Sequence, residues 1–166
     1  MKKNILLLNI LLIINFYSCT NNNIMIIEPI DKEFNEQLLT GKGLDSNLFS
    51  TKELLQYYQI SNFSNLTQND FQLKLNEFVS ENYKINNFSN FTILFYKKES
   101  FVNYSNYVYE AARDNQNGSI EEYKSNLIAK IVIIKAKDDQ EKAARHTTLY
   151  DKDSVVLEKI DKINLN

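Results

Sequence analysis

The stretch that decides the fold is Leu127-Ile128-Ala129-Lys130-Ile131-Val132-Ile133-Ile134-Lys135-Ala136, which is almost continuously apolar. A run of this kind lacks the polar face of a strand that borders water. It is typical of a strand in the interior of a sheet, where neighbouring layers cover both faces. We therefore predict a central strand at 127–136 that is buried on both faces.

Further strands are predicted on either side of this one. Ala143 to Tyr150 alternates in polarity, and Val155 to Ile160 returns after a turn at 151–153. With a turn at Asp138-Asp139, these segments form an antiparallel meander with the central strand. Upstream, Ile93-Leu94-Phe95-Tyr96 is short and β-prone, and it predicts another strand.

The segment Phe101 to Ala112 fits two patterns. Its apolar residues match a helical stripe, whereas the aromatic-rich stretch from Tyr104 to Tyr109 suits a strand. Asparagine and serine weaken a helix interior, because their side chains compete for backbone hydrogen bonds. We therefore predict a strand here.

Helical signals lie in the N-terminal half. Asp31 to Leu39 has helical apolar spacing and is followed by Gly41. Ser50-Thr51-Lys52-Glu53 has the form of a capping box and predicts a helix to about Gln59. Thr67 suits a helix N-cap with Asp70 three residues on. The face of that third helix is apolar and consists of Phe71, Leu75, Phe78 and Val79.

These elements predict an α+β fold in which two or three N-terminal helices precede a curled antiparallel sheet of four to five strands. Cystatin-like and NTF2-like domains share this layout, by analogy only. The layout by itself implies no function.

The chain begins MKKNILLLNILLIINFYSC, with two lysines before an apolar run that is too short to span a membrane. This is the pattern of a secretory signal. The signal ends at Phe16-Tyr17-Ser18-Cys19, where a small residue precedes the only cysteine. This ending resembles the lipobox of bacterial lipoproteins, although its aromatic residues depart from the commonest form. An unmodified Cys19 beside an ordinary signal is the alternative.

The resemblance implies that the peptide is cut before Cys19, whose sulfur carries diacylglycerol and whose amino group is acylated. Several acyl chains anchor a protein stably, whereas a single chain does so only marginally. Thr20, rather than aspartate, follows the cysteine, and by the resemblance this favours the outer membrane. The acidic tether that sends some lipoproteins to the cell surface is also missing, which favours the periplasmic face. We predict a signal peptide at 1–18, a lipid-anchored tether at 19–28 and one α+β domain at 29–166.

Composition excludes several partners. The formal net charge of the 166 residues is −2, and there is no basic stripe of the kind that nucleic-acid binding needs. Only three glycines are present, and no glycine-rich phosphate loop or dinucleotide motif occurs. We expect no cofactor and no metal, because a lone histidine and a lone cysteine cannot build a usual zinc site.

Two readings of the function follow. In the first, a non-catalytic envelope protein binds another protein, in an immunity or inhibitor role for example. Its contact residues would be Tyr104, Tyr107, Tyr109 and Arg113, because aromatic and arginine side chains dominate binding hot spots. In the second, a small-ligand pocket or hydrolase site inside the curled sheet uses His146 and an acid.

Glycosylation gives a third reading. Sequons occur at Asn62, Asn65, Asn87, Asn90, Asn103 and Asn117. In a eukaryotic secretory pathway they would mark a glycoprotein, whereas behind a bacterial lipobox they only reflect abundant asparagine. Asp153-Ser154-Val155 resembles an acceptor for bacterial envelope O-glycosylation, and we interpret it first as a turn.

Overall fold

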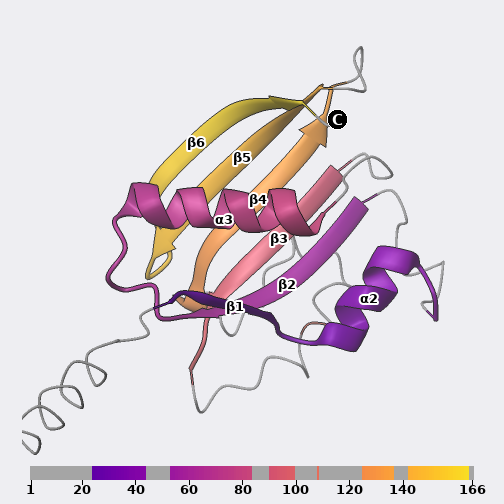
Figure 1. Cartoon of the computed structure of the whole chain (residues 1–166), viewed down its shortest axis with the longest axis horizontal. Helices are drawn as coiled ribbons and strands as arrows, with labels where there is room; N and C mark the ends of the chain where they lie inside the picture. The colour runs from indigo at the N-terminus through magenta and orange to yellow at the C-terminus, as the bar shows by residue number, and fades with distance from the viewer. Residues whose placement is uncertain are drawn as a thin grey trace, which may run out of the picture.

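The protein contains a sheet of six strands whose order in space is their order in the chain (Figure 1). The structure, a computed structural model, describes residues 24–43, 53–83, 90–99, 108, 125–136 and 142–164. The strands are β1 (Ile26–Pro29), β2 (Glu53–Ser61), β3 (Asn90–Lys97), β4 (Leu127–Lys135), β5 (Lys142–Asp151) and β6 (Ser154–Asn164). The sheet is mixed, because β2 and β3 run parallel while all other neighbours are antiparallel.

The predicted order, two or three helices followed by an antiparallel sheet of four to five strands, is wrong. The described residues form two helices, α2 (Lys32–Thr40) and α3 (Gln68–Asn82), which alternate with the first three strands. The analogy with cystatin-like and NTF2-like layouts depended on that order and is therefore wrong as well. β1 also places the last residues of the predicted tether, 19–28, in the sheet.

One source of the error is the helix predicted from Ser50 to about Gln59, because residues 53–61 form β2; another is β1, a strand that precedes both helices. β2 pairs on both sides, with β1 and with β3. Both of its faces are also buried: Leu54 and Ile60 lie in one apolar cluster, and Tyr57 lies in another. A capping box is a local signal, and pairing and burial on all sides override it.

The other two predicted helices are confirmed. α2 begins at Asp31, whose side chain accepts a 2.9 Å hydrogen bond from the Phe34 backbone, and it ends at Gly41 in the left-handed conformation. α3 begins at Thr67, whose hydroxyl accepts from the Asp70 backbone at 3.2 Å. α3 then lies across one face of the sheet (Figure 1).

The predicted meander is also confirmed, since β4, β5 and β6 pair antiparallel in sequence. β5 and β6 are joined by Lys152 and Asp153, with φ angles of 45° and 68°, as a tight two-residue hairpin turn requires. The burial of β4 on both faces is only partly correct. Its residues alternate between buried and half-buried, and Ile134 is 44% exposed.

Each face of the sheet carries an apolar cluster. The cluster on the α3 side includes Phe71, Leu75 and Val79 of the helix together with side chains from β2 to β5. The cluster on the opposite face consists of Phe34, Tyr57, Leu94, Tyr96, Val108 and Leu127. Val108 is the only residue of the segment 101–112 that the structure describes, and its backbone is helical rather than extended.

α2 closes the edge of β2 at the point where β1 ends. Asn35 of α2 is 5% exposed, and its side chain pairs with the backbone of Tyr57 as a neighbouring strand would. Its amide donates to the Tyr57 carbonyl at 2.9 Å and accepts from the Tyr57 N–H at 3.1 Å. The Gln56 side chain donates in return to the Asn35 carbonyl at 2.9 Å. These bonds fasten the helix to the sheet.

Replacing Asn35 with alanine should lower the free energy of unfolding by about 2–3 kcal/mol, because it leaves a buried backbone donor without a partner. Urea denaturation followed by circular dichroism measures the change. Asn82→Ala is the matched control, since that exposed amide bonds only the carbonyl of Phe78 in its own helix, and it should cost well under 1 kcal/mol. Equal losses in both variants would contradict this role of Asn35.

Candidate functional site

The residues named for partner binding, Tyr104, Tyr107, Tyr109 and Arg113, lie outside the described residues, as does Cys19. The motif Asp153-Ser154-Val155 lies at the β5–β6 hairpin, and its turn is confirmed. Among the sequon asparagines, Asn62 and Asn65 lie in the connection from β2 to α3, and Asn90 begins β3. Asn87, Asn103 and Asn117 lie outside the described residues.

His146 lies on β5, on the sheet face opposite α3. It is half-buried, and its cross-strand neighbours are Val132 on β4 and Ile160 on β6. It lines neither of the two cavities described below. Neither of these two cavities therefore brings His146 together with an acid.

An open groove of about 770 Å³ lies between α3 and strands β5 and β6. This volume is in the range of small-molecule sites. The helix contributes a polar stripe to the groove, and the strands contribute charged side chains. The lining residues are Asn69, Gln72, Leu73, Asn76, Glu77, Ser80, Arg145, Lys159, Asp161, Lys162 and Ile163.

Two hydrogen-bond donors in this groove are buried without an acceptor in the described part of the chain. They are Nε2 of Gln72, a residue that is 4% exposed, and Nε of Arg145. A buried donor without a partner costs about 1–3 kcal/mol. Native proteins contain few such groups, and each one calls for an explanation. A ligand that carries acceptors would satisfy both donors once small side-chain movements turned these atoms toward the groove.

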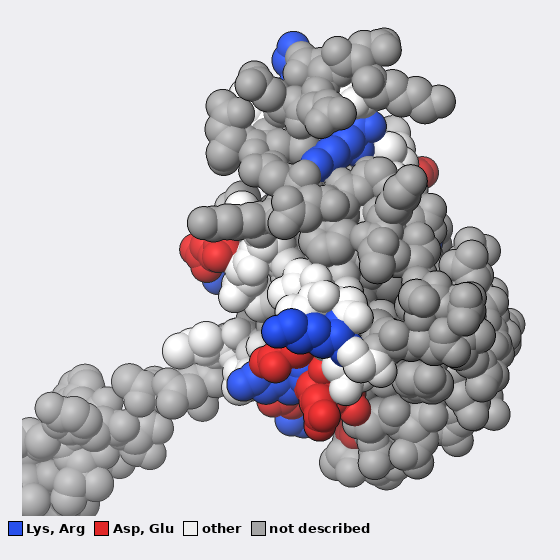
Figure 2. Space-filling model, turned by 90° about the vertical axis from the view of Figure 1, so that its right-hand side faces the viewer, with Lys and Arg blue, Asp and Glu red and all other residues white. Residues whose placement is uncertain are grey.

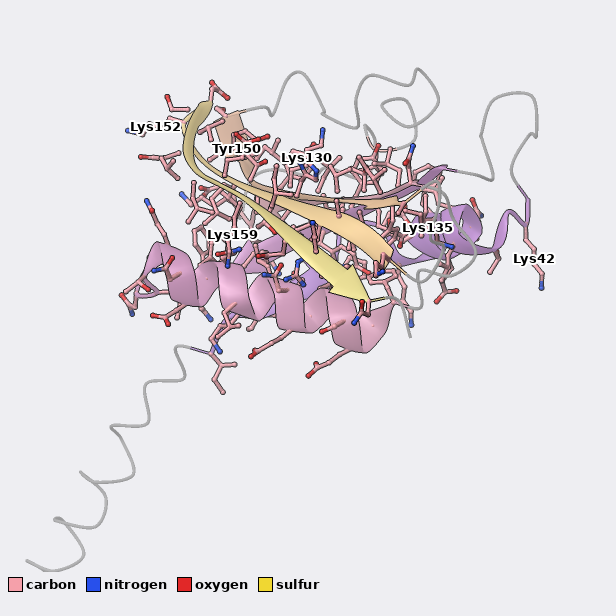
Figure 3. All side chains as sticks on the ribbon, turned by 90° about the horizontal axis from the view of Figure 1, so that it is seen from above. Lys42, Lys130, Lys135, Tyr150, Lys152 and Lys159 are labelled. Carbon is pink, nitrogen blue, oxygen red and sulfur yellow. The ribbon has the colours of Figure 1, made fainter. Side chains whose placement is uncertain are left out.

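Ionic and polar contacts fix the strand side of the groove. Arg145 Nη2 lies 3.2 Å from Asp161 Oδ2, and Lys159 Nζ lies 3.5 Å from Asp161 Oδ1. The register of β5 and β6 places Arg145 directly opposite Asp161. Figure 3 shows Lys159 on the side of β6 that faces α3. Because Asp161 holds Arg145 by one amino group, the orientation of the guanidinium is set while Nε stays unpaired.

A second, smaller cavity of about 220 Å³ lies between α2 and the end of α3. The hydroxyls of Tyr58 and Tyr83 are hydrogen-bonded to each other, and Tyr83 donates to Gln56 Oε1 at 3.2 Å. Burial raises the pKa of both tyrosines above the ordinary value, so both remain neutral at physiological pH. Gln56 in turn bonds Asn35. This chain of bonds is internally satisfied and serves the attachment of α2.

Charges elsewhere are mixed. Figure 2 shows one side of the molecule, where Lys and Arg lie beside Asp and Glu. Glu28 and Lys98 form an ion pair. Among the residues that the structure describes, no three His, Cys, Asp or Glu side chains gather as a metal site, and no helix has the length and hydrophobicity to cross a membrane.

Sequence reasoning missed this groove, although a signal existed. Asn69, Gln72, Asn76 and Ser80 recur at helical spacing beside the apolar face of α3. Arg145 lies between Ala143 and Thr147 on the alternation of β5, and this places it on the α3 side. The signal has two parts: polar residues beside the apolar face of a helix, and a charged residue on the core-facing side of a strand. Together they indicate a polar groove between the helix and the sheet.

Comparison with known proteins gives no relative. No family model, no curated protein and no solved structure matches the chain.

Replacing Gln72 with methionine, which has a similar size but no amide, should leave stability unchanged or raise it by about 1 kcal/mol. The physical reason is that the variant removes an unpaired buried donor. Asn76→Leu should instead lower stability by about 1–2 kcal/mol, because Asn76 Oδ1 accepts from the buried Thr147 hydroxyl at 3.3 Å. Urea denaturation of both variants tests the contrast. A large loss in Gln72→Met would mean that this amide has a partner inside the fold.

Proposed function

We propose that the protein is a lipid-anchored binding protein of the bacterial cell envelope whose α3–β6 groove holds a ligand rich in hydrogen-bond acceptors. The observation that carries the binding role is the pair of buried donors, Gln72 Nε2 and Arg145 Nε, which line one groove and lack acceptors in the described chain. Sites often carry groups that reduce the stability of the free fold, because those groups are satisfied only when the ligand is bound.

The charges of the groove narrow the class of ligand. Arg145 and Lys159 are cationic, whereas Asp161 and Glu77 are anionic; Lys162 borders the groove, but its side chain lies on the other face of β6. A polyanion such as nucleic acid or polyphosphate would meet the two acids. A ligand with one carboxylate and several carbonyl groups fits better, since arginine binds carboxylates through its planar set of donors. A short peptide segment with a free C-terminus has this chemistry.

The anchor would keep the groove near a membrane. β1 begins at Ile26, seven residues after Cys19. A fully extended chain spans about 3.3–3.6 Å for each residue, so the lipid and the sheet would be at most about 25 Å apart. The proposed binding protein would therefore sample ligands close to the bilayer surface.

The anchor is tested by replacing Cys19 with alanine in the full chain and labelling cells with radioactive palmitate. The wild-type protein should incorporate the label and partition into the detergent phase of a Triton X-114 extract. Cys19→Ala should lose the label completely, because the sulfur that accepts the lipid is gone. Ser18→Gly, which keeps a small residue before the cysteine, is the matched control and should remain labelled. Equal labelling of wild type and Cys19→Ala would contradict the proposed anchor.

The groove is tested by nuclear magnetic resonance on the ¹⁵N-labelled protein, with trialanine as the probe. The Gln72 side-chain amide and the Arg145 Nε–H signals should shift as they gain acceptors, and amidated trialanine should bind more weakly. The amide of Gln59 is the internal control, because it already donates to Glu28 at 3.0 Å on another part of the sheet. Gln72→Met should weaken binding about tenfold, the effect of about 1.4 kcal/mol. Absence of any shift at Gln72 and Arg145 would exclude a peptide-type ligand in this groove.

A further inference from the structure

β6 is a long edge strand. It has eleven residues, and in the described part of the chain it pairs only with β5 (Figure 1). Its exposed apolar side chains include Val155, Val156 and Ile160, the last of which is 59% exposed. The opposite edge differs, because β1 has four residues and ends at a proline, and Asn35 covers β2 beyond it. Proteins usually protect edges of the first kind.

The sequence of β6 is complementary to itself. Residues 157–163 read Leu-Glu-Lys-Ile-Asp-Lys-Ile. When two copies are laid antiparallel about Ile160, the strand aligns every charge with its opposite. The opposed pairs are Leu157 with Ile163, Glu158 with Lys162, Lys159 with Asp161, and Ile160 with itself, and each of the first three occurs twice by symmetry.

We propose that two copies of this chain associate through β6, antiparallel and with the two-fold axis at Ile160. The two six-stranded sheets then form one continuous sheet. Directly opposed side chains on an antiparallel pair contact one another, and opposite charges or apolar residues at such positions stabilise the pair. The exposed Ile160 would be covered by its own copy.

The two faces of β6 agree with this pairing. Lys159 and Asp161 face α3, because their β5 partners, Thr147 and Arg145, lie on that side. Glu158, Ile160 and Lys162 lie on the other face. Since residues opposed about Ile160 always differ by an even number, each pair remains on one face. Both copies of α3 consequently cover the same side of the joined sheet.

Neighbouring registers are unfavourable. A shift that centres the pair on Lys159 opposes two lysines, and a shift that centres it on Asp161 opposes two aspartates. Odd shifts would join the α3 face of one copy to the opposite face of the other, because side chains alternate along a strand. The register about Ile160 is the one that matches charges on both faces.

The dimer would also complete one wall of the groove. Lys159 and Asp161 line the groove and lie at the proposed seam. Lys159 of the second copy would be directly opposite Asp161, which already contacts Arg145. Each groove would therefore lie beside a residue of the other chain, and the two grooves would adjoin the two-fold axis.

Charge exchange tests the proposal. Sedimentation velocity of the full chain, at a large excess of detergent micelles over protein, should show a dimer that dissociates on dilution. Glu158→Lys and Lys162→Glu should each weaken the dimer about tenfold or more, because each turns two attractive pairs into two repulsive pairs. The double variant should restore it. Lys42→Glu makes the same charge change as Lys162→Glu at the far end of the molecule (Figure 3) and should have no effect.

Mixing the two single variants provides the decisive result. Glu158→Lys presents two lysines and Lys162→Glu presents two glutamates, so differently tagged copies should purify together when coexpressed, although each associates only weakly with itself. A wild-type chain that sediments as a monomer at every concentration would overturn the proposal. A dimer that is unaffected by the single changes would overturn it as well, because another surface would then hold it.

Thiol cross-linking in intact cells tests the register. Ile160→Cys places the two thiols opposite each other, and a short bismaleimide should join them. Val156→Cys is the control, because the register places those two thiols eight residues apart, or about 27 Å at 3.4 Å per residue. Equal cross-linking of both variants, or none at Ile160→Cys, would contradict the pairing about Ile160. Neither result depends on a ligand in the groove.

Discussion

β2 and β3 are neighbours that run in the same direction. The chain must therefore return from the end of β2 to the end of the sheet at which β2 began before β3 can start. Such a crossover needs a dozen or more residues and is usually a helix. In this protein the crossover is α3, and its apolar face covers one side of the sheet. The parallel pair thus places the helix, and the helix sets one wall of the groove. Beyond the apolar cluster, its polar residues face the charged side chains of β5 and β6.

Part of this arrangement could be predicted from the sequence, because some signals are local. The Thr67 cap and the apolar face that follows it specify α3 within a few residues, and the hairpin turn at Lys152 and Asp153 specifies the β5–β6 pair. β2 could not be predicted in this way. Its capping-box sequence favours a helix locally, and only its pairing with β1 and β3 makes it a strand. A short segment of sequence does not show which distant segments it will pair with, so pairing of this kind cannot be predicted from local patterns.

The candidate site was hidden for a related reason. An amide such as Gln72 has the same local signature whether its side chain meets water or a buried strand. Whether Gln72 belongs to a binding site depends on its proximity to Arg145. That residue is 73 positions away in the chain and lies opposite Asp161 on the sheet. Residue type alone favoured the tyrosines and the arginine in 104–113. Hot-spot preferences describe which residue types bind partners, but they do not show where those residues lie in the fold. The groove becomes visible only when helix and sheet are assembled.

The turn of two residues between β5 and β6 has a consequence for how this protein can vary. The alternation of side chains along β6 is set by that turn together with the register irregularity where Leu149 pairs with Leu157 and Tyr150 with Val155. With that irregularity kept, inserting or deleting one residue in the turn would exchange the two faces of the strand, so that Ile160 would point toward α3 and Asp161 would leave Arg145. Inserting or deleting two residues would keep each side chain on its face but would shift the register of β6 against β5 by two residues. The length of the hairpin is therefore under tighter physical constraint than its composition.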